Sequence, residues 1–135
     1  MAKFKTHQVM VKETLRLLMS LARHDPESCE DFWNRSINHR IIGTFLMCAH
    51  FKILHEVNPD SYTKDDDRVK LKDIHTACHT HWTIVDRTLE VGLKKKFIEA
   101  DEKGLYASAV TIKYANELYK VRKDISIIDR ELPNG

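Results

Sequence analysis

The chain between residues 69 and 111 reads VKLKDIHTACHTHWTIVDRTLEVGLKKKFIEADEKGLYASAVT. In its first part, Leu71, Ile74 and Cys78 recur at helical spacing, so one face of a helix over 71–78 can be buried. The order that this stretch predicts is a helix, a tight turn, a second helix and a two-stranded hairpin.

The second helix is expected to begin at Thr80. The Thr80 side chain offers an oxygen to the backbone N–H groups that lack a partner at a helix start. The helical period then continues toward Lys95 through Ile84, Val85, Thr88, Leu89 and Val91.

After the lysines the pattern favours a β-hairpin. Phe97 and Ile98 suit a strand, residues 101–104 suit a turn, and residues 105–110 suit a return strand. Gly104 can adopt a positive φ, which hairpin loops of three to five residues usually need. A helix, turn, helix and hairpin in this order form a winged helix-turn-helix.

This arrangement resembles the winged-helix domain of MarR-type bacterial and archaeal transcriptional regulators. The family pattern is a helix, a Ser/Thr-rich turn, a second helix ending in Leu plus basic residues, a hairpin, and a Thr that opens the next helix. The matching parts here are 71–78, 80–83, 84–95, 97–110 and Thr111. The chain differs at Lys96, where the family usually has Gly, and at 101–103, where the family has Asp-x-Arg. The resemblance implies a DNA-binding homodimer that a small-molecule effector can release.

Length and composition suit one globular domain. The chain has 135 residues, of which 42% are hydrophobic and 31% charged, and its net charge is +2. It contains no apolar run near the roughly 20 residues needed to span a bilayer, and its N-terminus lacks the apolar core of a secretory signal. Three widely spaced cysteines suit reduced thiols. We therefore expect a cytoplasmic protein with no membrane partner and no cofactor.

Helices are expected on both sides of the winged region, giving a single domain over 1–135 with helices in 1–57, the winged unit in 69–111 and a last helix in 111–132. The first helix covers 7–23, and Asp25 caps a short second helix. Ser36 caps a third helix, over 37–57, whose inner face carries Ile41, Phe45, Cys48, Ala49 and Ile53. The fold class is thus mainly α with a small β-hairpin wing, and with N- and C-terminal dimerisation helices.

The last helix has the most regular apolar pattern in the chain. Its apolar residues alternate at intervals of four and three, as in a coiled-coil seam: Tyr114, Leu118, Val121, Ile125, Ile128 and Leu132. We expect this seam to form a homodimer. The alternative is packing against the first helix of the same chain.

The second helix of the winged unit is the candidate DNA-reading element, because residues at the start of such a helix reach base edges in the major groove. The expected contacts with bases are Thr80, His81 and Thr83, while Trp82 can meet a thymine methyl or a sugar and Arg87 a base or a phosphate. Phosphate contacts are expected from Lys94, Lys95, Lys96 and Lys103. Two alternatives stay open. Trp82 can instead close the core, and the lysines can be a solvated helix end. Five basic and five acidic residues between 80 and 104 make this surface neutral in total.

A histidine cluster offers a weaker metal hypothesis. His75 and His79 are four residues apart on an expected helix, so both can reach one zinc ion, and Cys78 or His81 can add a ligand. No second Cys/His cluster completes a site, so solvated histidines are the favoured interpretation. No catalytic motif occurs either, which predicts that the protein is not an enzyme.

The sequence therefore favours a homodimeric, sequence-specific regulator that binds duplex DNA. The alternative is a winged-helix protein–protein interaction module, and the weaker one is a zinc-dependent sensor that uses His75 and His79.

Overall fold

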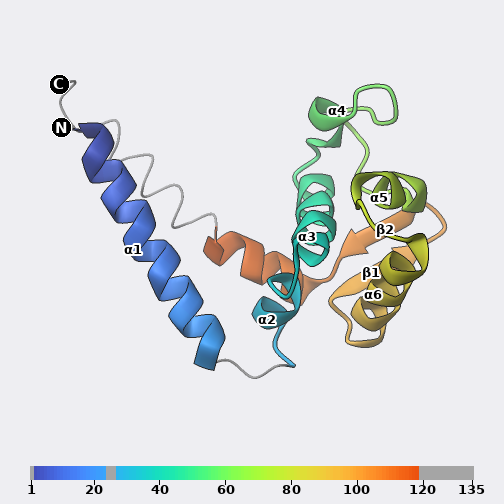
Figure 1. The fold of residues 1–135 in the computed structure, drawn as a ribbon. Coiled ribbons are helices and arrows are strands. Elements are labelled where there is room, and N and C mark those ends of the chain that lie inside the picture. Colours follow the sequence, from blue (N-terminus) through green and yellow to red (C-terminus); the bar gives the residue numbers. More distant parts are fainter. Residues whose placement is uncertain (1, 24–26, 119–135) are drawn as a thin grey trace.

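The computed structural model describes residues 2–23 and 27–118. The elements in chain order are α1 (Ala2–Arg23), α2 (Cys29–Trp33), α3 (Ile37–His50), α4 (Leu54–Val57), α5 (Leu71–Ala77), α6 (Trp82–Lys94), β1 (Ile98–Asp101) and β2 (Gly104–Ala107). A further helix follows β2 over 109–118 (Figure 1). The expected mainly helical chain with one small antiparallel hairpin is confirmed.

The hydrophobic core lies among α2, α3, α5, α6 and the hairpin. Its fully buried members come from all of these elements and from α4, and include Phe32, Trp33, Ile42, Leu46, Leu54, Ile74, Val85 and Ile98. The two-stranded sheet has little burial capacity of its own, so it depends on the helices that cover it.

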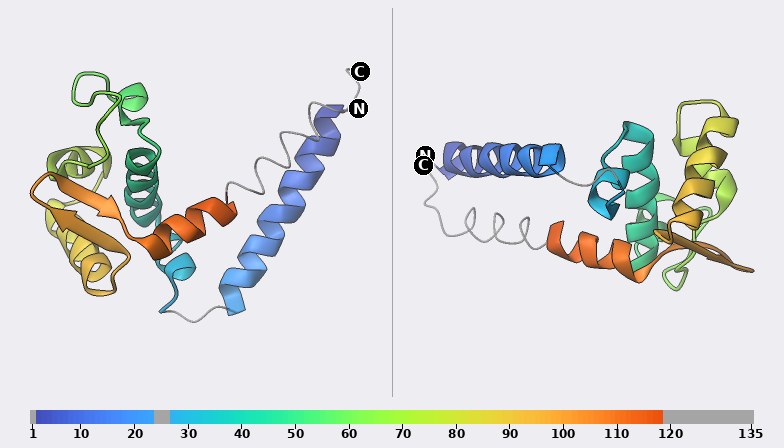
Figure 2. Two further views of the ribbon diagram at one scale, coloured as in Figure 1. Left: turned by 180° about the vertical axis from the view of Figure 1, so that it is seen from behind. Right: turned by 90° about the horizontal axis from the view of Figure 1, so that it is seen from below.

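The first helix begins at Ala2, five residues earlier than predicted. It lies apart from the other helices, at the opposite end of the molecule from α6 and the hairpin (Figure 2). Its expected apolar stripe is exposed: Val11, Leu15 and Leu18 have 68%, 57% and 52% of their surface accessible in the described part of the chain.

The predicted single helix over 37–57 is wrong, because the chain breaks it into α3 and α4. Ser36 does cap α3, as expected, by accepting the backbone N–H of His39 at 3.2 Å. The helix ends because Lys52 adopts a left-handed φ of 57°. The N–H of Lys52 then donates to Ala49, at 3.1 Å, and the next N–H to Cys48, at 3.0 Å, which is the Schellman ending of a helix.

This ending also changes the inner face that the sequence predicts. Ile53, expected to face inward, is 38% exposed, and Leu54 is fully buried in its place. Phe45 and Cys48 are only half-buried. The α3 side chains that enter the core are Ile42, Leu46 and Ala49. The short helix before α3 begins at Cys29 with Ser28 as its cap, and the predicted cap Asp25 lies outside the described residues.

The hairpin is tighter than expected. Ile98 pairs with Ala107 and Asp101 with Gly104, so that only two residues form the loop. Asp101 accepts the backbone N–H groups of Lys103 and Gly104 at 2.9 and 3.2 Å. Gly104 has a φ of 142°, and a Cβ there would lie 2.7 Å from the Val69 carbonyl oxygen.

A third segment pairs with the hairpin, which the sequence did not indicate. Val69 and Leu105 exchange two backbone hydrogen bonds, at 2.8 and 3.0 Å, immediately before α5. Among the described residues, no helix combines the length and the apolar character that a membrane crossing needs.

Candidate nucleic-acid interface

Helix α6 has one face in the core and the opposite face in solvent. Val85, Leu89 and Gly92 are buried against the rest of the domain. The exposed residues Thr83, Arg87, Glu90 and Lys94 recur every three or four positions, so they form one outward stripe. We call these four residues the outward stripe of α6. The helix and the adjacent hairpin lie at the edge of the molecule in each view (Figures 1 and 2).

The start of α6 differs from the prediction. The cap is His81, not Thr80, and its Nδ1 accepts the backbone N–H of Thr83 at 3.2 Å. Thr80 belongs to the preceding turn, where its N–H donates to the Cys78 carbonyl at 2.9 Å. Trp82 is 62% exposed, so it does not close the core.

A contact that the sequence does not indicate joins α5 to α6. His75 Nε2 lies 2.6 Å from Asp86 Oδ1, and the His75 ring meets the Trp82 ring edge-on, with centroids 6.1 Å apart. Because a carboxylate only accepts, His75 is the donor here. These three side chains link the two helices at the surface. Trp82 and Asp86 are four residues apart on α6, but the turn between the helices separates them from His75, so no single helical period indicates the contact.

The other end of α6 is turned sharply into the hairpin. Lys96 has a φ of 63°, its N–H donates to Leu93 at 3.1 Å, and the N–H of Phe97 donates to Gly92 at 2.9 Å. This is a second Schellman ending, with lysine where glycine is usual.

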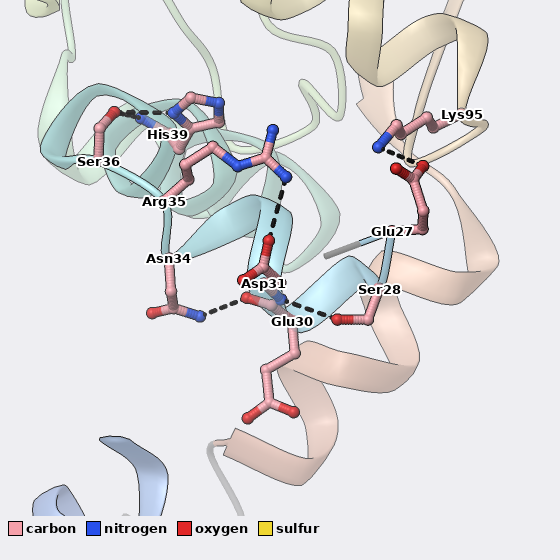
Figure 3. Close-up of polar contacts among 9 residues, drawn as sticks. All are labelled: Glu27, Ser28, Glu30, Asp31, Asn34, Arg35, Ser36, His39 and Lys95. Atoms are coloured by element: carbon pink, nitrogen blue, oxygen red, sulfur yellow. Dashed lines mark hydrogen bonds and ion pairs between the residues drawn. The ribbon is translucent and has the colours of Figure 1, made fainter. Parts of the chain in front are cut away.

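The three lysines that were predicted to act together are separated by their contacts. Lys95 Nζ lies 2.7 Å from Glu27 Oε2, which ties the end of α6 to the segment before α2 (Figure 3). Lys94 and Lys96 are exposed, as is Lys103 in the hairpin loop. Within the described ranges, the side chains of Arg87 and Lys94 have no ion-pair or hydrogen-bond partner.

The hairpin presents more acid than base. Arg68 stacks over the Tyr106 ring at 3.8 Å and bonds Asp101 at 3.0 Å, so its charge is largely satisfied. Burial raises the pKa of Asp101, but hydrogen bonds from Arg68 and backbone N–H groups outweigh this and leave that pKa below its ordinary value. Glu99 and Glu102 remain exposed on the hairpin.

Hydrogen bonds join the last described helix, over 109–118, to the α2 region and to the residue before β1. Thr111 is fully buried; its hydroxyl donates to the Phe97 carbonyl at 2.8 Å and accepts Trp33 Nε1–H at 3.0 Å. Tyr114, half-buried against the core, accepts a hydrogen bond from Asn34 at 2.8 Å. The helix begins at 109, two residues before the expected opening at Thr111, and its first hydrogen bond runs from the Ile112 N–H to the Ser108 carbonyl at 3.0 Å.

Other members of the predicted seam lie at or beyond the end of the described chain. Leu118 is half-buried. Val121, Ile125, Ile128 and Leu132 lie outside the described residues. The dimer seam therefore stays a prediction, and Tyr114 packs within its own chain.

The histidine pair does not have the geometry that a shared metal requires. Helix α5 ends at Ala77, and Cys78 is extended with a ψ of 118°, so His75 and His79 are not on one helix face. His75 is also bonded to Asp86. Among the described residues, no three His, Cys, Asp or Glu side chains form a group that could hold a metal ion.

The three thiols lack the environment of a reactive cysteine. Burial raises the pKa of Cys29, and hydrogen bonding with Thr111 and Trp33 offsets that rise only in part. Burial also raises the pKa of Cys48 and of Cys78. A raised pKa leaves little thiolate at neutral pH.

Comparison with known proteins adds no relative. The chain matches no protein-family model, and neither a curated protein nor a solved structure gives a significant match.

Proposed function

We propose that this protein is a winged helix-turn-helix regulator of transcription that binds duplex DNA as a homodimer. In this proposal α5 and α6 form the helix-turn-helix, α6 enters the major groove, and the hairpin is the wing. The observation that carries it is the outward stripe of α6. It is exposed along the whole helix, it includes Arg87 and Lys94 with unengaged charges, and it is backed by a buried face that fixes its direction.

The charges near α6 allow an estimate of the electrostatic contribution. Arg87, Lys94, Lys96 and Lys103 are exposed in each protomer. If all four reach phosphates, a dimer makes eight contacts, and the logarithm of the affinity falls with the logarithm of salt with a slope of about −7. Glu90 and the acidic hairpin oppose non-specific attraction. We therefore expect weak binding to random duplex and much tighter binding to a selected site.

Dimerisation is proposed to use the apolar seam of the last helix, with help from α1. The exposed stripe of Val11, Leu15 and Leu18 supports a partner for α1, because a monomer rarely leaves such a row uncovered. A two-fold dimer would present two copies of α6, as palindromic sites require.

Substitutions in the lysine run provide a test with an internal control. Lys94→Ala removes an unengaged charge and should weaken duplex binding about 3- to 10-fold at moderate salt. Lys95→Ala removes a charge already paired with Glu27 and should weaken it by less than 2-fold. Filter-binding isotherms at several salt concentrations measure both. Equal effects of the two variants, or no effect of Arg87→Ala, would contradict the proposed orientation of α6.

The second candidate is a protein–protein interaction module. It is favoured by the exposure of Trp82 and Ile84 on α6, at 62% and 52%, beside an acidic hairpin. The two candidates differ in their response to salt. Duplex binding weakens steeply as salt rises, whereas an apolar protein contact is nearly insensitive to it.

A further inference from the structure

The hydrogen bond that caps α6 determines which nitrogen of the His81 ring carries the hydrogen. The backbone N–H of Thr83 can only donate, so the Nδ1 atom that it meets at 3.2 Å must present its lone pair. As long as this cap is made, the hydrogen of the imidazole ring is on Nε2. His81 is therefore an acceptor toward its own helix and a donor on its other side.

The position of His81 makes that donor available to a ligand. The residue is exposed and immediately precedes α6. Its ring lies against the Trp82 ring, with centroids 6.4 Å apart and planes at 57°, which restricts the ring further. Trp82 in turn contacts His75, so the orientation is supported from α5. The donor is thus held in a defined direction at the end of the helix that enters the groove in the proposed function.

We propose that His81 is a specificity-determining residue that donates one hydrogen bond from Nε2 to an acceptor on a base edge in the major groove. Such acceptors are guanine N7 or O6, adenine N7 and thymine O4, whereas cytosine presents only a donor amino group there. His81 therefore discriminates against cytosine at one position of each half-site. This inference rests on the proposed duplex binding and deepens it.

Two substitutions separate the two roles of the ring. Asn places an acceptor near the position of Nδ1 and is a strong helix cap, but it does not reach as far as Nε2. Gln places an amide donor near the position of Nε2 but is a poor cap. His81→Asn should therefore keep the fold and lose the base contact, and His81→Gln should do the reverse. His79→Asn is the matched control, because His79 is an exposed histidine two residues earlier.

The experiment first selects duplexes from a random pool with the wild-type 135-residue chain. It then measures the affinity of each variant for the selected duplex, and the stability of each variant by urea unfolding. We expect His81→Asn to keep or raise the unfolding midpoint and to bind about 5- to 10-fold more weakly, which is the loss of one hydrogen bond. Its own selected sites should tolerate cytosine at one position that the wild type excludes. His81→Gln should lower the midpoint yet retain binding within 3-fold where it is folded.

Three results would overturn the inference. One is a His81→Asn variant that binds like the wild type and selects the same sites. Another is a loss that is equal on selected and random duplex, which indicates a phosphate contact instead. The third is an equal loss in the His79→Asn control. A wild-type chain that selects no duplex would refute the proposed function itself, and is distinguished from the other results because it needs no variant.

Discussion

Thr111 gives the sharpest test of how the fold is held together. Its hydroxyl is fully buried, donates to the Phe97 carbonyl and accepts Trp33 Nε1–H. Thr111→Val keeps the shape and removes these two hydrogen bonds, together with the 3.5 Å contact between the hydroxyl and Cys29 Sγ. The Trp33 N–H then lacks this acceptor in a site where the residue is only 2% exposed, which costs about 2 kcal/mol. The Phe97 carbonyl still accepts the Ser108 N–H at 3.2 Å, so losing the hydrogen bond from the Thr111 hydroxyl costs only about 1 kcal/mol of stability.

The added methyl group returns about 1 kcal/mol by its burial, so we expect Thr111→Val to lower the free energy of unfolding by about 2 kcal/mol. Thr111→Ser keeps the hydroxyl and loses one buried methyl, which costs about 1 kcal/mol. Urea unfolding followed by tryptophan fluorescence shows which of the two variants has the larger free energy of unfolding, and the buried Trp33 reports on this site directly. A valine variant at least as stable as the serine variant would refute the role assigned to the hydroxyl.

Three further predictions concern a helix end, a buried phenol and the dimer. Lys96→Gly should be about 1 kcal/mol more stable than Lys96→Ala in thermal unfolding, because both remove the charge and only Gly relieves the left-handed φ of 63°; equal stabilities would contradict the backbone assignment. Burial and the hydrogen bond to Asp73 raise the pKa of Tyr62 to about 12, so its contribution to stability is present below the ordinary pKa of about 10 and is lost as pH rises toward 12. The stability of the wild type relative to Tyr62→Phe should therefore fall from pH 9 to pH 11, and a constant difference would contradict it. Replacing Leu118 and Ile125 together by lysine should give a monomer in sedimentation experiments. A stable double variant that stays dimeric would show that the last helix does not form the dimer interface.

The helices that the sequence predicts best are those with a clear apolar period. Ile74 and Cys78 indicate α5, and Val85 and Leu89 indicate α6, because burial of one face leaves a pattern in the chain. Leu71, expected on the same buried face as Ile74, is instead 46% exposed. The hairpin is also predicted, since Gly104 marks its turn. Each of these signals is local.

Element ends were predicted less well, because the residues that make them carry weak signals. Lys52 and Lys96 end α3 and α6 in a left-handed conformation that lysine does not favour, and neither Gly nor Pro marks the place. Thr80 is by type a better helix cap than His81, yet the turn after α5 places His81 at the start of α6.

Contacts between distant residues could not be predicted at all. The Trp33–Thr111 hydrogen bond joins positions 78 residues apart, and the Lys95–Glu27 ion pair joins two segments that share no pattern. The expected group of DNA-binding lysines changes because Lys95 is paired with Glu27, which lies in a segment far away in the sequence. Only the packed chain brings such pairs together.

Selection of duplexes from a random pool by the purified 135-residue chain tests the proposed function most directly. We predict enrichment of a two-fold-symmetric site whose half-sites lie about one helical turn apart, with an affinity that falls steeply as salt rises. A pool that stays random after repeated rounds at low salt would contradict it, and so would retention that does not change with salt.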